Sequence, residues 1–443
     1  MIDAKKIIRL YSGIIIVLVL ALSPVFPQNP TELLEKLTLQ QAVDFAIEHN
    51  MDIKKQQSEI RVAEAQLEGT LADWRFQLDL TSEYDHLYNT GATQNPGSNA
   101  DQLYTYLEAS QPILTFGKAP NAAKVSQVNI ELQKTSLKEV MQSVEHDVTV
   151  AFYNILLQQE LVDVNEKAVS IAAEHLKNAE LRLNQGINTK FDVTRSRVDL
   201  ANRRADLITT QTALEKARHS FNQLLNMPPS TLIQMEGRLE FKEYHPEVDA
   251  LWEAARKNRP GLLSKQLTIK QNQYQLEYYK ASYSPMVSIG GKYNIEHSKY
   301  EDQNDRNFNQ WSAYLKITTP LWDGNKTESQ IKVSRGYIEQ AEYDLNKETL
   351  AARTDIEQAI LDIDKQKELV ETNQSAVELA ELSLSMAQYS YENGQGTTLD
   401  VTDAELSLRT ARSNLANSVN NYLVAMADLK KAVGLDELPG QKD

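Results

Sequence analysis

The sequence contains no cysteine among its 443 residues. Disulfide frameworks, thiolate metal sites, thiol nucleophiles and a lipidated N-terminal cysteine are therefore excluded. Glycine and proline are also scarce, with 16 and 13 residues, which argues against an all-β or loop-rich protein. The 46 basic residues are outnumbered by 61 acidic ones, so the chain has no cationic surplus with which to bind nucleic acid.

Recognisable catalytic and metal-binding patterns are missing as well. The seven histidines are scattered singly, and none lies four residues from another. The sequence has no glycine-rich phosphate loop and no G-x-S-x-G motif. We therefore expect neither an enzyme nor a metalloprotein, and we expect no cofactor.

Residues 1–27 differ in character from the rest of the chain. Lys5, Lys6 and Arg9 precede a short apolar run from Ile14 to Leu22, which gives way to a polar stretch. This order is typical of a secretory signal peptide, although an uncleaved N-terminal anchor helix is an alternative. No later segment is long and apolar enough for a transmembrane helix. The sequence therefore predicts an exported protein.

The remainder of the chain is a tandem repeat. The segment from Gly186 to Thr194 aligns with the segment from Gly394 to Thr402, an offset of 208 residues. Two copies of one long unit therefore organise the chain. The predicted divisions are repeat 1 at 28–225, an inter-repeat linker at 226–246 that forms an irregular band around the middle, repeat 2 at 247–434 and a C-terminal tail at 435–443.

Each repeat contains a long segment with apolar residues at every seventh position. These residues are Val148, Ile155, Val162, Val169, Leu176 and Leu183 in repeat 1, and Ile356, Ile363, Val370, Val377, Leu384 and Tyr391 in repeat 2. A seven-residue period predicts coiled-coil helices with left-handed supercoiling. A second helix follows each long one, so we predict antiparallel helical hairpins at about 118–225 and 325–433.

Two pairs of strands are predicted ahead of the hairpins. Alternating apolar and polar residues indicate strands at about 75–88 and 103–113 in repeat 1, and at about 285–296 and 310–320 in repeat 2, with polar loops at 89–102 and 296–309. The strands are near the length that crosses a bilayer, and several aromatic residues near their loop ends suit a membrane interface: Tyr84, Tyr88, Tyr293, Tyr300 and Trp311. Four strands cannot close a barrel, whereas three copies of the chain would supply twelve.

The sequence resembles the TolC-type outer-membrane efflux channel family over essentially all of the mature chain. The resemblance is carried by Tyr391-x-x-Gly394-x-x-x-x-Leu399-Asp400-Val401-x-Asp403-Ala404, by the looser match Leu183-x-x-Gly186-x-x-x-x-Phe191-Asp192-Val193, and by Pro112 and Pro320 at the strand-to-helix turns. It implies a mainly α fold with a small β part, built from two tandem repeats of helix–strand–strand–long helix–helix. The implied assembly is a homotrimer whose twelve-stranded β-barrel in the outer membrane continues as a twelve-helix periplasmic α-barrel.

The resemblance also implies partners, a location and an activity. The expected location is the outer membrane of a Gram-negative-type cell, with the helices extending into the periplasm. The expected partners are outer-membrane lipid, a periplasmic adaptor, and an inner-membrane pump or ABC exporter. The channel would conduct substrates to the exterior and would open at its helix tips when the partners bind.

Several residues at the tips acquire expected roles from the same resemblance. The expected constriction or gate residues are Asp400, Asp403, Tyr391 and Asp192; the expected adaptor-contacting residues are Gly186, Thr189, Gly394 and Thr397; and Pro112 and Pro320 mark the strand–helix junctions. Gly396 stands where the best-known members place a latch arginine, for which Lys190 or Arg195 could substitute. Helix capping alone is the alternative interpretation of Asp192 and Asp400, because Thr189 and Thr397 precede them at the spacing of a capping box.

Two other functional classes remain open from the sequence. A soluble periplasmic coiled-coil adaptor would use its strands in a small β-domain and would be recovered as a soluble monomer. A secreted enzyme would need a nucleophile or a metal site, for which the sequence offers no candidate.

Overall fold

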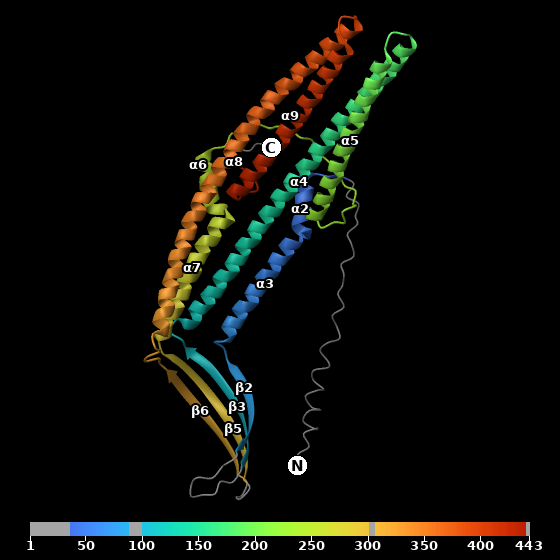
Figure 1. The fold of residues 1–443 in the computed structure, drawn as a ribbon. Coiled ribbons are helices and arrows are strands. Elements are labelled where there is room, and N and C mark those ends of the chain that lie inside the picture. Colours follow the sequence, from blue (N-terminus) through green and yellow to red (C-terminus); the bar gives the residue numbers. More distant parts are fainter. Residues whose placement is uncertain (1–35, 88–99, 301–305, 440–443) are drawn as a thin grey trace.

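The structure is a computed structural model that describes residues 36–87, 100–300 and 306–439. The predicted signal peptide and Tyr88 lie outside these residues. The molecule is elongated, with a β-sheet at one end and the tips of two helical hairpins at the other (Figure 1). None of the helices in the described ranges has a stretch both long and apolar enough to span a bilayer.

The two repeats contain the same α-helices and long strands in the same order. Repeat 1 consists of α2 (Leu39–His49), α3 (Met51–Ala72), β2 (Gln77–Leu87), β3 (Ala100–Leu114), α4 (Lys118–Asn184) and α5 (Lys190–Leu224). Repeat 2 consists of α6 (Val248–Asn258), α7 (Pro260–Lys280), the short 3₁₀ turn η2 (Ala281–Tyr283), β5 (Met286–Tyr300), β6 (Arg306–Thr318), α8 (Lys326–Glu392) and α9 (Thr398–Val433). The predicted two-repeat, mainly helical fold is therefore confirmed.

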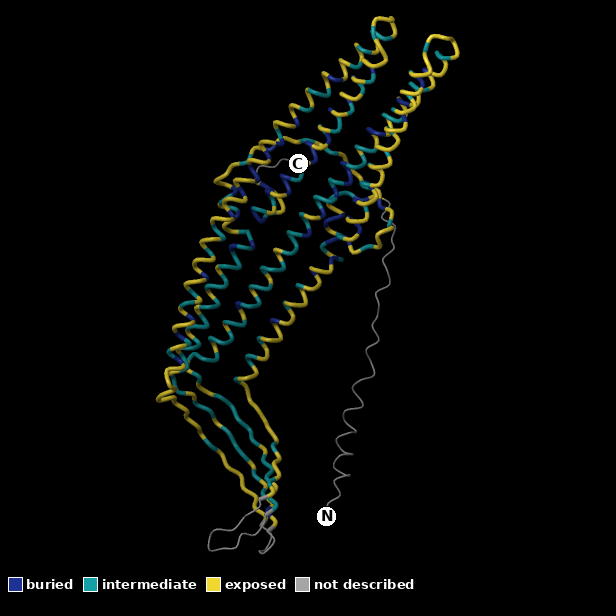
Figure 2. The backbone as a smooth tube through the Cα atoms, viewed as in Figure 1, coloured by how far each residue is buried: buried dark blue, intermediate teal, exposed yellow. Residues whose placement is uncertain are grey.

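The helices α4 and α8 set the length of the molecule. Each has 67 residues, which corresponds to about 100 Å. Each packs against the shorter helix that follows it, and the buried heptad residues gather near the middle of the molecule, as Ile155 and Ile363 do with 0% exposure. There the short helices α2 and α6 cover the hairpins and complete two equivalent hydrophobic clusters. Towards the tips, buried positions become sparse (Figure 2).

The inter-repeat linker is largely irregular and is attached to both repeats. Its two-residue strand β4 (Gln234–Met235) pairs in parallel with β1 (Lys36–Leu37), a pairing that the sequence patterns did not predict. Further along, the buried Tyr422 hydroxyl of α9 accepts a hydrogen bond from the Tyr244 backbone N–H at 3.0 Å and donates to the Lys242 carbonyl at 2.9 Å. These bonds satisfy buried polar groups that would otherwise be costly.

The four long strands form one antiparallel sheet in the order β2-β3-β5-β6. The register places Leu80, Leu107, Tyr293 and Trp311 on one face, because Leu80 pairs with Leu107, Leu107 with Tyr293, and Tyr293 with Trp311. The opposite face carries mostly polar residues, such as the paired Asp79 and Glu108. This alternation gives the sheet one apolar and one polar surface.

The strands extend further than the sequence patterns indicated. The loop predicted at 296–309 is too long, because β5 continues to Tyr300 and β6 begins at Arg306. The loop predicted at 89–102 also ends early, since β3 begins at Ala100. Backbone pairing between neighbouring strands continues through these polar residues. Their sequence lacks the alternation of apolar and polar residues by which a strand is predicted.

Candidate functional site

The two hairpin tips turn at glycine residues. Gly186 and Gly394 have φ angles of +77° and +72°, a left-handed conformation that glycine adopts without steric cost. The Gly186 N–H donates to the Leu183 carbonyl at 2.9 Å, and the Gly394 N–H donates to the Tyr391 carbonyl at 3.1 Å. Both tips are therefore short, hydrogen-bonded reversals between long helices.

A complete capping box begins the second helix of each hairpin. In α5 the Asp192 carboxylate accepts hydrogen bonds from the Thr189 backbone N–H and hydroxyl, both at 2.8 Å. In α9 the Asp400 carboxylate accepts the corresponding two bonds from Thr397, both at 2.7 Å. In each case the threonine hydroxyl also accepts the aspartate backbone N–H at 3.3 Å. Helix capping is thus a structural role that these four residues have within a single chain.

The caps also affect ionisation. The backbone hydrogen bond from Thr397, and then its hydroxyl bond, lower the pKa of Asp400 from its ordinary value of 3.8. Thr189 lowers the pKa of Asp192 in the same way, with a smaller contribution from Arg195. Both carboxylates are therefore charged at neutral pH. Asp403 lies three residues beyond Asp400 and is exposed. The tip of the second hairpin therefore presents two acidic side chains at the start of α9.

A contact between the two tips involves Tyr391 and an arginine that the sequence did not single out. Arg182, in the last turn of α4, donates from Nη1 to the Tyr391 hydroxyl at 2.8 Å. Its guanidinium carbon also lies 5.0 Å from the centroid of the Tyr391 ring, within the range of a cation–π interaction. The only available signal was a basic residue in the last turn of the long helix.

The tip around Gly396 leaves little room for the arginine that the family resemblance would place there. A Cβ atom on Gly396 would lie 3.0 Å from the Tyr391 backbone nitrogen and 3.2 Å from the Ser390 carbonyl carbon. A side chain would therefore require the backbone of the tip to shift. Arg182 supplies a cation to Tyr391 from the other repeat, whereas the suggested substitutes Lys190 and Arg195 begin α5.

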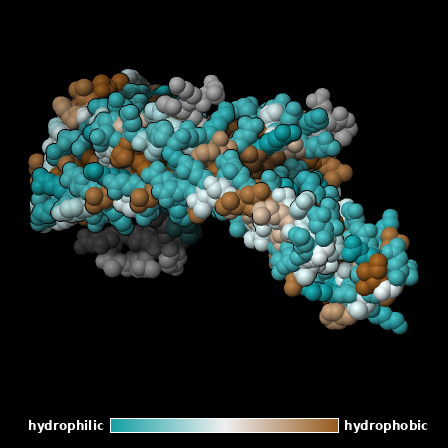
Figure 3. Space-filling model, turned by 90° about the horizontal axis from the view of Figure 1, so that it is seen from above, coloured by the Kyte–Doolittle hydropathy of each residue, from teal (hydrophilic) through white to brown (hydrophobic). Residues whose placement is uncertain are grey.

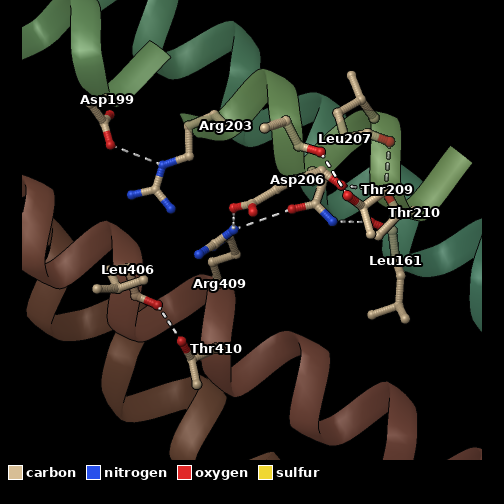
Figure 4. A network of polar contacts seen from close by, with 12 residues as sticks. Leu161, Asp199, Arg203, Asp206, Leu207, Thr209, Thr210, Leu406, Arg409 and Thr410 are labelled. Carbon is tan, nitrogen blue, oxygen red and sulfur yellow. Dashed lines mark hydrogen bonds and ion pairs between the residues drawn. The ribbon is translucent and has the colours of Figure 1, made fainter. Parts of the chain in front are cut away.

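Below the tips, a network of charged side chains joins the two hairpins. Arg409 of α9 donates to the Asp206 carboxylate of α5 at 2.7 Å and to the Asn165 side-chain oxygen of α4 at 3.3 Å (Figure 4). Asn165 is buried, with 8% of its surface exposed. Nearby, Arg203 pairs with Asp199 on α5 at 3.2 Å. We call the contact between α4–α5 and α9 the inter-hairpin seam.

The two predicted proline junctions lie beside the turns from the strands into the long helices. Pro112 lies within β3, where the register with β5 shifts between Pro112 and Leu114. The turn into α4 instead uses the left-handed residues Phe116 and Gly117, and the turn into α8 uses Gly324 and Asn325 after Pro320. The prolines accompany the strand ends, and the residues after them reverse the chain.

Comparison with known proteins identifies the family of the chain. A sequence profile described as "Outer membrane efflux protein" matches residues 42–227 and 251–435, nearly all of both repeats. The chain belongs to this family. The outer membrane protein TolC of Escherichia coli (strain K12) is 22% identical over 363 residues, which cover 79% of this chain and 73% of TolC. The outer membrane efflux protein BepC of Brucella suis is 19% identical over 399 residues, covering 90% of this chain and 85% of BepC.

A solved structure supports the same architecture. The CmeC outer membrane channel of Campylobacter jejuni matches with a TM-score of 0.76 and 16% sequence identity, over 89% of this chain and 85% of that one. This likeness concerns the fold alone. Membership of the family confirms the predicted outer-membrane location and assigns the chain to efflux and secretion channels, a family of transport proteins rather than of enzymes. It disfavours the soluble adaptor.

Proposed function

We propose that three copies of this chain form one continuous channel, with a twelve-stranded barrel in the outer membrane and a twelve-helix tunnel in the periplasm. The channel would be the outer component of a tripartite efflux or type I secretion system. It would receive substrates from a periplasmic adaptor and an inner-membrane pump or ABC exporter, and would release them outside the cell.

The open sheet is the observation that carries this proposal. Within the described residues, β2 and β6 each have one neighbour, so the sheet has two unpaired edges. One of its faces is apolar, and residues such as Leu80 and Leu315 are 70% and 64% exposed there. Lipid would favour the apolar face but would penalise unpaired backbone groups at the edges. Pairing β6 of each copy with β2 of the next satisfies both edges at once.

The helical part of a single copy also leaves large apolar side chains exposed. Several large apolar side chains on α5 and α8 are more than half exposed: Phe191, Val198, Ile208, Leu350, Leu361, Leu379, Leu382, Met386 and Tyr389. Viewed from the tips, apolar patches interrupt a mainly hydrophilic surface (Figure 3). Neighbouring copies that place α5 beside α8 would bury these residues and close the tunnel.

The tips are the proposed periplasmic gate. In a threefold arrangement, Asp400 and Asp403 would place six carboxylates around one axis and would favour cations. Tyr391, held by Arg182, and Asp192 would keep neighbouring tips in place. The exposed turns at Gly186, Thr189, Gly394 and Thr397 would be the surfaces that the adaptor contacts.

Crosslinking between strand edges tests the assembly directly, because a chain without cysteine gives no background reaction. We would introduce Thr81→Cys in β2 and Ser312→Cys in β6, and treat outer-membrane fractions with a bis-maleimide. The double variant should give a ladder that ends at the trimer, whereas each single-cysteine variant should give none. The purified trimer should then conduct ions in planar bilayers. A soluble monomer without a ladder would contradict the proposal and favour the adaptor.

The partners require a separate experiment. Crosslinking of the tagged protein in intact cells, followed by affinity capture, should recover an adaptor together with a pump or an ABC exporter. Substitution of both tip turns, Gly186→Glu and Gly394→Glu, should reduce this recovery while leaving the trimer ladder intact. Unchanged recovery would place the adaptor contact away from the tips.

A further inference from the structure

We propose that the inter-hairpin seam is a proton-sensitive clasp, in which His175 and His146 of α4 hold carboxylates of α9 and release them as the pH rises. This inference rests on the proposed function, because it describes how the two hairpins of one chain are kept together before the tips part.

The upper contact lies near the tips. His175 Nε2 is 2.9 Å from Glu405 Oε1, and the two side chains are only 30% and 16% exposed. His175 belongs to repeat 1 and Glu405 to repeat 2, so the bond crosses the seam. A charged imidazolium therefore attracts α9 to α4 in a partly desolvated place, where such pairs are stronger than at an open surface.

The charges around His175 are mostly paired with one another. Glu174 and Asp199 add negative charge close to the imidazole. The groove beside it is lined by further charged residues from α4, α5 and α9: Lys167, Asp199, Arg203, Glu405, Arg409 and Arg412. The four cations among them bond to carboxylates, namely Lys167 to Asp163, Arg203 to Asp199, Arg409 to Asp206 and Arg412 to Glu381. Glu405 is thus the carboxylate of this groove that bonds to a histidine.

The direction of the pH effect follows from the closed geometry. The hydrogen bond to Glu405 raises the pKa of His175 above its ordinary value of 6.5, and this outweighs the opposing effect of burial. A group with a raised pKa in the closed state stabilises that state fully below its ordinary pKa. The stabilisation is lost as the pH rises through the raised value. Closed hairpins are therefore favoured at acidic pH, and the pH range over which this stabilisation is lost lies above pH 6.5.

A second histidine repeats the arrangement near the middle of the molecule. His146 Nε2 lies 2.7 Å from Asp428 of α9, and its Nδ1 lies 2.9 Å from Asp147 of its own helix. The bond to Asp428 raises the pKa of His146, against burial and the nearby Lys431. The other charged groups that face this region come from α2, α4, α9, the linker and the C-terminal segment: Asp44, Glu145, Arg238, Glu240, Lys242, Lys430, Asp436 and Glu437.

Between the two histidines, the seam contains a charged contact without a histidine. The bond from Arg409 to Asp206 also joins α9 to the first hairpin, and a guanidinium stays charged throughout. It contributes to closure without an imidazole. The chain therefore offers its own matched control for the two histidine contacts.

Distance measurements between spin labels test the clasp. We would place labels at Asn178→Cys on α4 and Ser407→Cys on α9, two exposed positions, and dilute labelled chains with unlabelled ones so that only distances within one chain are measured. The ratio of separated to closed hairpins should increase about two- to five-fold between pH 5.5 and 8.5, the range expected of a partly exposed ion pair. An unchanged distance distribution would overturn the inference.

Variants identify the groups responsible. His175→Gln should weaken the pH response and the double variant with His146→Gln should remove it, because glutamine retains hydrogen bonding but cannot be charged. Arg409→Gln should increase separation at both pH values and leave the response intact. A response that survives the double histidine variant would refute the clasp. A chain that conducts ions but shows no pH response would also refute the clasp and would leave the proposed channel standing. A chain that fails to conduct but keeps the histidine-dependent pH response would refute the proposed channel and not the clasp.

Discussion

The contact between Arg182 and Tyr391 gives the sharpest test of the proposed gate. The two residues come from different repeats, and they meet in the last turns of α4 and α8, beside the hairpin tips. Tyr391→Phe removes the 2.8 Å hydrogen bond but keeps the ring above which the guanidinium lies. Tyr391→Leu removes both interactions. The pair of substitutions therefore separates the hydrogen bond from the cation–π contact.

The expected magnitudes follow from these two interactions. A partly buried hydrogen bond contributes about 1 kcal/mol, and a cation–π contact of this kind contributes about 0.5–1 kcal/mol. Since 1.4 kcal/mol is a factor of ten, the closed tip should be weakened about five-fold by Tyr391→Phe and about ten- to thirty-fold by Tyr391→Leu. If the three tips open together, the three effects multiply. Tyr391→Phe alone should then shift the equilibrium between closed and open channels on the order of a hundredfold towards the open state.

Single-channel recording in planar bilayers measures the outcome as open probability. The order should be wild type, then Tyr391→Phe, then Tyr391→Leu, with Arg182→Gln close to the last. Tyr389→Phe is the matched control, because it removes a hydroxyl from the same helix turn and keeps the ring that a neighbouring copy would cover. Equal open probability in all of these proteins would refute the gating role of the contact, and an effect of the control would indicate a general loosening of α8.

Three further predictions concern the tips and the seam. Asp400→Asn with Asp403→Asn should reduce cation preference, measured as a smaller reversal potential in a salt gradient; an unchanged potential would leave Asp400 only its capping role. Thr397→Ala should destabilise the first turn of α9 by about 1 kcal/mol, seen as faster amide exchange there, while Thr397→Ser should behave as wild type. Leucine at the buried Ala172 or Ala380, which are 3% and 9% exposed, should cost about 1–3 kcal/mol through overpacking and lower the trimer yield; normal assembly would exclude tight packing at these two positions.

The architecture was predictable because its determinants are local and repeated. Apolar residues at every seventh position define helices far longer than usual, and Gly186 and Gly394 mark where they reverse. The capping boxes need only a threonine and an aspartate three residues apart. Because the whole pattern occurs twice, a weak signal in one repeat is supported by the same signal in the other.

The contacts between the hairpins could not be predicted in the same way. Arg182 and Tyr391 are 209 positions apart in the sequence, and Arg409 and Asp206 are 203 apart. Nothing in the heptad pattern states which face of α4 will meet α9. The loop-side ends of the strands differed from the prediction for a related reason, since β3, β5 and β6 continue to pair through polar residues when a neighbouring strand is present.

The two repeats share a backbone fold, but equivalent side chains in them make different contacts. Asn165 accepts a hydrogen bond from Arg409 of the other hairpin, whereas its counterpart Asn373 donates to Ser418 within its own. The seam inside one chain therefore contains charged, partly exposed pairs, while the faces of α5 and α8 proposed to meet between chains carry exposed apolar side chains. Separating charged groups at a partly exposed seam costs little because water replaces each partner, but separating apolar faces exposes them to water. We therefore expect the tips to part first along the polar seam within each chain, with the contacts between chains holding the trimer together.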